Sequence, residues 1–133
     1  MEQTYYFIII GALLFEYCLS TTSSVLNMMS ISKKIPDGFQ DFYDGKKYSR
    51  SQEYLKDKTK LGLYSSTFSL ILTLIVIYFG LFGFLDELIR SNSTHYIISG
   101  LLFFGILFLI NDILNIPFSL YSTFVVEEKY GFN

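Results

Sequence analysis

Few side chains in this sequence could carry out bond-breaking chemistry, and they are scattered. The 133 residues contain one histidine, His95, and one cysteine, Cys18. A catalytic zinc ion takes several protein ligands, commonly two histidines one helical turn apart plus a carboxylate, with a glutamate base beside them. One histidine cannot supply that set, and it offers no Ser-His-Asp arrangement either. We therefore assign no catalytic residue and no metal ligand in this chain.

Two acidic side chains, Glu16 and Asp112, lie inside apolar stretches. An ionisable group inside a membrane is costly, and it usually faces a partner or a water-filled cavity. Glu16 therefore either lines an internal aqueous chamber or is a protonated carboxyl that hydrogen-bonds to a neighbouring helix. Asp112 either lines the same chamber or lies at the membrane interface.

The adjacent carboxylates Glu127 and Glu128 suggest a pair for acid–base catalysis. Neighbouring positions on an α-helix point about 100° apart, so these two side chains would not converge on one substrate atom. The alternative interpretation for Glu127 is a solvated residue at a helix end.

The elements that carry these residues are three apolar blocks, at about 5–29, 61–85 and 96–116. About 20 helical residues cross a hydrocarbon core of about 30 Å, so each block is long enough. The block at 61–85 carries no charge, which disfavours a soluble helical domain. The predicted fold is all-α: three transmembrane helices, a cytoplasmic-side loop helix and a C-terminal amphipathic helix.

Capping and breaking residues predict where the helices begin and end. Ser49 and Gln52 have the spacing of a capping box, which predicts a helix that starts near Arg50 and continues into the second span. Pro117 is predicted to end the third span, because proline has no backbone N–H. An amphipathic segment should follow, with one face formed by Tyr121, Phe124, Val125 and Glu128. Gly131 is predicted to end that segment in the left-handed conformation.

Basic residues predict the orientation in the membrane. The stretch between the first two spans holds Lys33, Lys34, Lys46, Lys47, Arg50, Lys56, Lys58 and Lys60. Positive residues stay on the cytoplasmic side, so this loop and the segment 117–133 should lie inside, and the amino terminus and the turn 86–95 outside. Lys56, Lys58 and Lys60 are expected to contact anionic lipid headgroups. Interleaved acids leave the loop only mildly positive, so the expected partner is a lipid bilayer and not a nucleic acid.

The end of the chain resembles a known signature. Residues 117–133 resemble the Pro-x-x-x-Tyr-x-x-Phe-Val-x-Glu-Glu-Lys-aromatic-Gly-Phe-Asn pattern of the CAAX prenyl protease 1 family, multi-span membrane zinc metallopeptidases. The matching residues are Pro117, Tyr121, Phe124, Val125, Glu127, Glu128, Lys129, Tyr130, Gly131, Phe132 and Asn133. The stretch 51–58 resembles the family's first-loop pattern more weakly.

This resemblance implies that the chain is the amino-terminal region of a zinc metalloendopeptidase, with zinc and the catalytic helices in a later portion. Its share would be to wall the intramembrane chamber and to contact the catalytic portion through the signature residues. A protein or peptide would be the substrate of the full enzyme, in processing or quality control of membrane-associated proteins. The alternative is a stand-alone three-span membrane interaction or accessory protein without protease activity.

Overall fold

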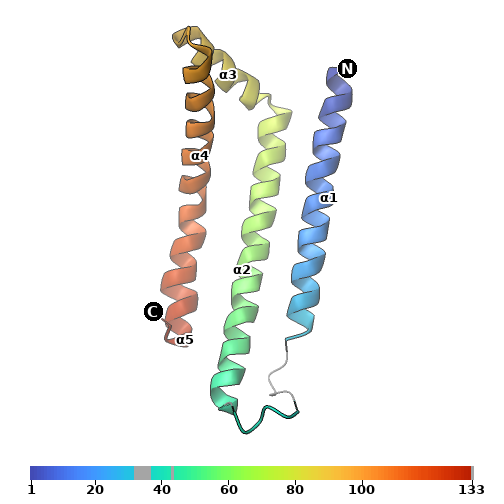
Figure 1. The fold of residues 1–133 in the computed structure, drawn as a ribbon, viewed down its shortest axis with the longest axis vertical. Coiled ribbons are helices and arrows are strands. Elements are labelled where there is room, and N and C mark those ends of the chain that lie inside the picture. The colour runs from blue at the N-terminus through green and yellow to red at the C-terminus, as the bar shows by residue number, and fades with distance from the viewer. Residues whose placement is uncertain (32–36, 43, 133) are drawn as a thin grey trace. The chain divides into compact units, whose positions relative to one another are not determined.

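The computed structural model describes residues 1–31, 37–42 and 44–132, and these residues form helices and turns without a strand. The elements in chain order are α1 (Glu2–Met29), α2 (Gly45–Tyr78), α3 (Leu81–Asn92), α4 (Tyr96–Tyr121), the π-helix η1 (Ser122–Glu127) and α5 (Glu128–Tyr130) (Figure 1). Within this described part, three helical stretches are long and apolar enough to cross a membrane: Glu2–Met29, Gly45–Tyr78 and Tyr96–Tyr130. The predicted all-α architecture with three membrane-crossing helices is therefore confirmed at this level.

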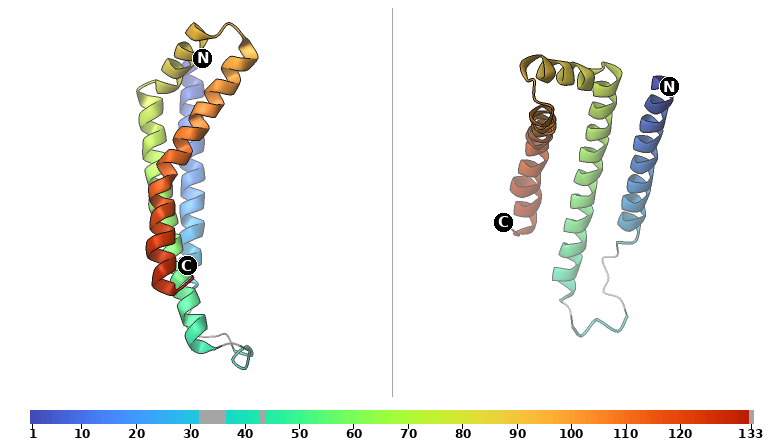
Figure 2. Two further views of the ribbon diagram at one scale, coloured as in Figure 1. Left: turned by 90° about the vertical axis from the view of Figure 1, so that its left-hand side faces the viewer. Right: turned by 45° about the horizontal axis from the view of Figure 1, so that its top comes forward.

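The chain divides into two compact units. Unit 1 comprises Met1–Thr67 and Phe118–Asn133, and unit 2 comprises Phe68–Pro117. Within unit 1, the first half of α2 lies between α1 and the C-terminal segment (Figures 1 and 2). The hydroxyl groups of Tyr17 on α1 and Thr67 on α2 are hydrogen-bonded at 2.7 Å. A groove of about 330 Å³ is lined by five polar side chains, Ser24, Asn27, Ser30, Gln52 and Thr59, and by the apolar Ile31 and Leu55.

The start of α2 differs from the prediction. The helix begins at Gly45, earlier than the expected start near Arg50. Asp44 caps it, because its Oδ1 accepts the backbone N–H of Lys46 at 3.0 Å while its own carbonyl accepts that of Tyr48 at 2.9 Å. Aspartate is as good an N-cap as serine, so Ser49 falls inside the helix. As predicted, the helix then runs without a break into the apolar stretch.

The end of α2 also differs, because the uncharged run 61–85 is not one helix. The helix ends at Tyr78, and Gly80 has a φ of 66°, in the left-handed region that glycine enters at little cost. The chain turns there and begins α3 at Leu81, so the expected polar turn at 86–95 is largely helical. A Cβ atom at Gly80 or Gly83 would meet nothing within 4 Å, so these glycines do not serve close packing.

Pro117 does not end the third apolar helix. Helix α4 continues through it to Tyr121, although proline cannot donate to the carbonyl of Ile113. Membrane helices tolerate proline because local π-type adjustments re-satisfy freed backbone groups. The helix here widens into η1 directly after Tyr121.

The π geometry changes which side of the C-terminal segment is covered. The face predicted from α-helical spacing is exposed: Tyr121, Phe124 and Val125 are 51%, 60% and 46% accessible. Val126 and Tyr130 are instead buried, each at 5%. Bonds from residue i to i+5 place side chains differently from the 3.6-residue spacing, so the α-helical pattern alone does not identify the covered side of this segment.

Candidate functional site

Two neighbouring residues of α2 bind the C-terminal segment with opposite charges. Oδ2 of Asp57 accepts hydrogen bonds from Nζ of Lys129 at 2.8 Å and from the hydroxyl of Tyr130 at 2.7 Å. Nζ of Lys58 donates to Oε1 of Glu127 at 3.0 Å and to Oγ of Ser122 at 2.7 Å. We call these six side chains the clamp: Asp57, Lys58, Ser122, Glu127, Lys129 and Tyr130. The order acid–base on α2 meets acid–base on the segment, so the clamp fixes their register.

An aromatic cluster stands beside the clamp. The Tyr54 ring lies 5.7 Å from that of Tyr130 in an edge-on arrangement and 4.8 Å from that of Phe132. Nζ of Lys58 lies 5.5 Å from the centroid of the Tyr54 ring. Aromatic pairs contribute about 0.5–1.5 kcal/mol beyond the area they bury. Tyr54 therefore anchors the same segment that its helical neighbours Asp57 and Lys58 hold by charge.

Gly131 shapes the end of the segment. Its backbone N–H donates to the carbonyl of Glu128 at 3.1 Å, and that of Phe132 donates to the carbonyl of Glu127 at 3.0 Å. This is a Schellman motif, which requires a left-handed residue at its centre, and Gly131 has a φ of 71°. The predicted helix-ending role of Gly131 is confirmed. The turn brings Phe132 back against Tyr54, and a Cβ at position 131 would lie 3.1 Å from Nη2 of Arg50.

The clamp residues lie outside the apolar runs, and their ionisation is mutually stabilised. The hydrogen bond from Lys129, followed by that from Tyr130, holds the pKa of Asp57 below its ordinary value. The hydrogen bond to Asp57 raises the pKa of Lys129 to about 12. The hydrogen bond to Glu127 likewise raises the pKa of Lys58. Asp57, Lys58 and Lys129 are therefore charged at neutral pH and held by their partners, which suits a structural junction better than an acid–base site.

The structure separates the two adjacent carboxylates. The Glu127 side chain is 27% accessible and pairs with Lys58, so it is not a solvated helix end. Glu128 is exposed. As predicted, the two do not converge on one point. Pro117 and Tyr121 are exposed on α4, Phe132 is 55% accessible beside Tyr54, and Asn133 lies outside the described residues.

The two acids predicted to line a chamber lie in different units. Glu16 is exposed on α1 in unit 1, and Asp112 is exposed on α4 in unit 2. Among the residues the structure describes, no hydrogen bond or ion pair links either carboxyl to another residue.

Sequence reasoning missed half of the clamp. Asp57, Lys58 and Ser122 were not proposed as contacts of the signature, and neither was Tyr54 in the neighbouring aromatic cluster. Lys58 was expected to contact lipid headgroups, but its ammonium group binds Glu127 and Ser122. A usable signal existed: the opposite charges of Asp57 and Lys58 complement those of Glu127 and Lys129, and the stretch 51–58 resembles the family pattern.

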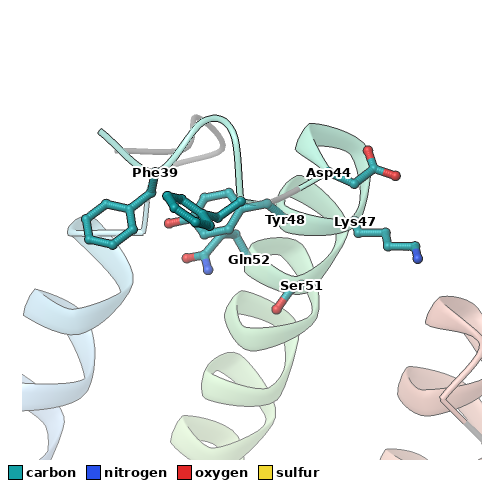
Figure 3. A pocket seen from close by; sticks show the side chains of 7 residues that line it. Phe39, Asp44, Lys47, Tyr48, Ser51 and Gln52 are labelled. Atoms are coloured by element: carbon teal, nitrogen blue, oxygen red, sulfur yellow. The ribbon is translucent and has the colours of Figure 1, made fainter. Parts of the chain in front are cut away.

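A second hollow lies beside the start of α2. It has a volume of about 680 Å³ and is lined by Phe39, Phe42, Asp44, Lys47, Tyr48, Ser51 and Gln52. Phe39, Tyr48 and Gln52 gather on one side, whereas the side chains of Asp44 and Lys47 extend away from them (Figure 3). The charged groups of Asp44 and Lys47 therefore do not converge with the other lining side chains, and we assign no chemistry to this hollow.

Zinc does not fit this chain by itself. In the part that the structure describes, no three histidine, cysteine, aspartate or glutamate residues stand close enough to hold a metal ion. The carboxylates of the clamp are taken by lysine and tyrosine donors.

Comparison with known proteins identifies the family. Residues 25–133 match the family model described as CAAX prenyl protease N-terminal, five membrane helices. The chain belongs to this family. A probable CAAX prenyl protease 1 from Schizosaccharomyces pombe is 38% identical over 120 residues, covering 77% of this chain and 24% of the relative. CAAX prenyl protease 1 from Saccharomyces cerevisiae is 27% identical over 110 residues, covering 75% and 24%.

The solved structure of S. mikatae Ste24p has the same fold in this region. It superimposes with a TM-score of 0.77 at 24% sequence identity, over 93% of this chain and 30% of that chain. The chain spans about a quarter of the length of the curated CAAX prenyl proteases it matches. It is thus a membrane N-terminal domain of the CAAX prenyl protease family. All six clamp residues fall within the residues 25–133 that the family model matches.

Proposed function

We propose that this chain works as the amino-terminal membrane part of a zinc metalloendopeptidase that processes membrane-associated proteins. In this role it walls an intramembrane chamber and holds the signature segment in place for a catalytic portion. That portion supplies zinc and the groups that cleave the peptide bond. The chain's own residues position the signature segment and enclose the chamber, and they carry out no step of the hydrolysis.

The clamp is the observation that carries this proposal. It seats one side of the segment 122–132 on α2 and leaves Phe124, Val125 and Glu128 exposed on the other side. A segment whose inner face is fixed by two ion pairs is pre-organised for binding, because less conformational freedom is lost when a partner docks. The exposed face is therefore where the catalytic portion would dock.

Glu16 and Asp112 are the proposed chamber-lining residues. Each is exposed on a helix that is otherwise apolar. A carboxyl facing lipid is costly, whereas one facing a wet cavity is not. We expect Glu16→Gln and Asp112→Asn to alter peptide turnover by the complete protease without loss of the folded domain. Normal turnover in both variants would remove them from the chamber.

A chimeric enzyme tests the proposal as a whole. Residues 25–133 of this chain would replace the matching segment of the S. pombe relative, and cleavage of a prenylated Cys-a-a-X peptide would be measured in membranes. We expect the chimera to be active, to lose activity with Lys58→Glu, and to regain it with Lys58→Glu combined with Glu127→Lys. Lys56→Glu, on the same helix outside the clamp, is the matched control. A chimera that inserts and folds yet cleaves nothing would contradict the proposed function.

For the topology, we propose that the loop helix and the amphipathic C-terminal helix lie on the cytoplasmic side. The contacts of Asp57 and Lys58 with residues 122–130 support this, because they hold the basic part of α2 and the segment at one end of unit 1. Reporter fusions after Asn92 and Asn133 should report opposite sides of the membrane, with the second one cytoplasmic. Equal reports from both positions would refute this orientation.

A stand-alone accessory protein without protease activity is the second candidate function. The self-contained pairing of the clamp charges suits it equally well. Determining the nucleotide sequence that follows the Asn133 codon separates the candidates: an open frame leading to a His-Glu-x-x-His helix favours the protease, and a stop codon favours the accessory protein.

A further inference from the structure

Helix α3 has three different sides, and only one of them is covered by the protein. Ile89 is 7% accessible, so this side is covered. Phe84 and Leu88, one turn apart, are 64% and 50% accessible. Charged and polar side chains, Glu87, Arg90 and Ser91, occupy the remaining side. A helix with one covered, one apolar exposed and one polar exposed side is suited to a boundary between protein, lipid and water.

Helix α3 connects two helices that are candidate membrane spans. The helix follows α2 after Gly80 and precedes α4, and both of these helices are long and apolar enough to cross a membrane. Within unit 2, α3 lies crosswise to the last turns of α2 and the first turns of α4 (Figure 2, right). A crosswise helix between two spans lies along the membrane surface, not through it.

Aromatic residues mark the headgroup level on both sides of α3. Tyr78 and Phe79 precede it, with accessibilities of 76% and 68%, and Tyr96 follows it at 80%. Exposed tyrosines at the ends of spans are enriched at the membrane–water interface. Phe84 and Leu88 thus lie on a helix that is flanked at both ends by exposed aromatic residues.

Two of the three charged side chains of α3 pair with each other. Nε of Arg90 donates to both carboxylate oxygens of Asp86, at 2.9 and 2.8 Å. Glu87 leaves the helix with a formal net charge of −1, which does not attract it to anionic headgroups. Burial of the apolar side is the remaining driving force, at about 25 cal/mol per Å².

We propose that α3 is an interfacial helix, whose Phe84 and Leu88 insert among the acyl chains just below the headgroups while Glu87 and Arg90 stay in water. The occupant of the exposed apolar side is the lipid of the leaflet in which α2 ends and α4 begins. Helices of this composition lie in the interface plane with the apolar face buried about 5–10 Å deep. The inference depends on the membrane location of the chain and not on its proposed role in a protease.

The absence of tryptophan from the sequence provides a direct test. Phe84→Trp and Glu87→Trp each introduce a single tryptophan, one on the apolar and one on the polar side of α3. The full chain would be reconstituted into phosphatidylcholine vesicles with or without bromine on the acyl chains, and tryptophan emission would be recorded with acrylamide as an aqueous quencher. A folded variant is recognised by an unchanged helical circular dichroism spectrum. Should Phe84→Trp misfold, Leu88→Trp probes the same side.

We expect the tryptophan at position 84 to emit at shorter wavelength, to lose most of its intensity in brominated vesicles and to resist acrylamide. The tryptophan at position 87 should show the reverse. Quenching of position 84 by acrylamide and not by bromine would place the apolar side in water and overturn the proposal. Quenching by neither reagent would mean that protein covers this side, which also overturns it.

Discussion

Nζ of Lys129 lies 2.8 Å from Oδ2 of Asp57, 72 positions earlier in the chain. The residues that follow each of these two add further bonds. The hydroxyl of Tyr130 also donates to Asp57, and Lys58 binds Glu127. A segment far away in the sequence is thus held by one acidic and one basic side chain of α2. The stability of this junction is open to measurement residue by residue.

Charge reversal at Lys58 should weaken the junction, and a swap should repair it. Lys58→Glu places two carboxylates together, whereas Lys58→Glu with Glu127→Lys restores opposite charges. The side chains are 34% and 27% accessible, so solvent screening limits the pair to about 1 kcal/mol. Thermal unfolding in detergent, analysed as a double-mutant cycle, should give a coupling energy of that size. A coupling near zero would show that the two charges do not interact.

Tyr130 contributes both a hydroxyl group and a ring, and two substitutions separate them. Tyr130→Phe removes the hydrogen bond to Asp57 and keeps the contact with Tyr54, so it should cost about 1–2 kcal/mol of unfolding free energy. Tyr130→Ala removes a ring that is only 5% accessible and should cost about 3–5 kcal/mol. Equal losses for the two variants, measured by denaturant unfolding in micelles, would contradict this assignment.

Gly131→Ala should be more harmful than the same change at Gly80. Both glycines have similar left-handed dihedrals, with φ of 71° and 66°. Only at position 131 would a Cβ meet another atom, Nη2 of Arg50 at 3.1 Å. Backbone strain of about 1–2 kcal/mol is common to both, so the excess loss at Gly131 measures the steric contact. Adding Arg50→Ala should remove the excess. If it does not, the contact is unimportant.

The Asp57–Lys129 bond should give a flat dependence of stability on pH near neutrality. The pKa of Asp57 is lowered in the folded state, so its contribution is present above the ordinary aspartate value of about 3.9 and is lost as the pH falls through the lowered pKa. The pKa of Lys129 is raised to about 12, so its contribution is present below the ordinary lysine value of about 10.4 and lost as the pH rises through 12. The melting-temperature difference between the native chain and Asp57→Asn should thus stay constant from about pH 5 to 9. A steady slope across that range would exclude this pair as its source.

The parts of the fold that depend on local composition were predictable. Uninterrupted apolar runs of membrane-crossing length indicate spans whatever the rest of the chain does. Boundaries were less predictable, because several residues compete at each of them. Asp44 and Ser49 are both good N-caps, and the choice went to Asp44. Gly80 broke an uncharged run, whereas Pro117 failed to end one.

The clamp was harder to foresee because it joins residues far apart in the chain. The complementary charges of Asp57 and Lys58 allow a pairing with Glu127 and Lys129, but charges at the end of a span are equally typical of the membrane interface. In the η1 π-helix Val126 is buried and Glu127 is partly covered, whereas Phe124 and Val125, which α-helical periodicity places on one face, are exposed. Local patterns fix neither a long-range partner nor a departure from the ordinary helix.

The charge order of the clamp also bears on how the domain is made. The ribosome synthesises α2 well before Ser122. Asp57 and Lys58 therefore have no clamp partners until residues 122–130 have been synthesised. A segment displaced by two residues along α2 would bring Lys129 against Lys58. Repulsion between these two lysines therefore disfavours a segment in the wrong register. The side chains of the clamp thus favour the correct alignment as this end of the domain assembles.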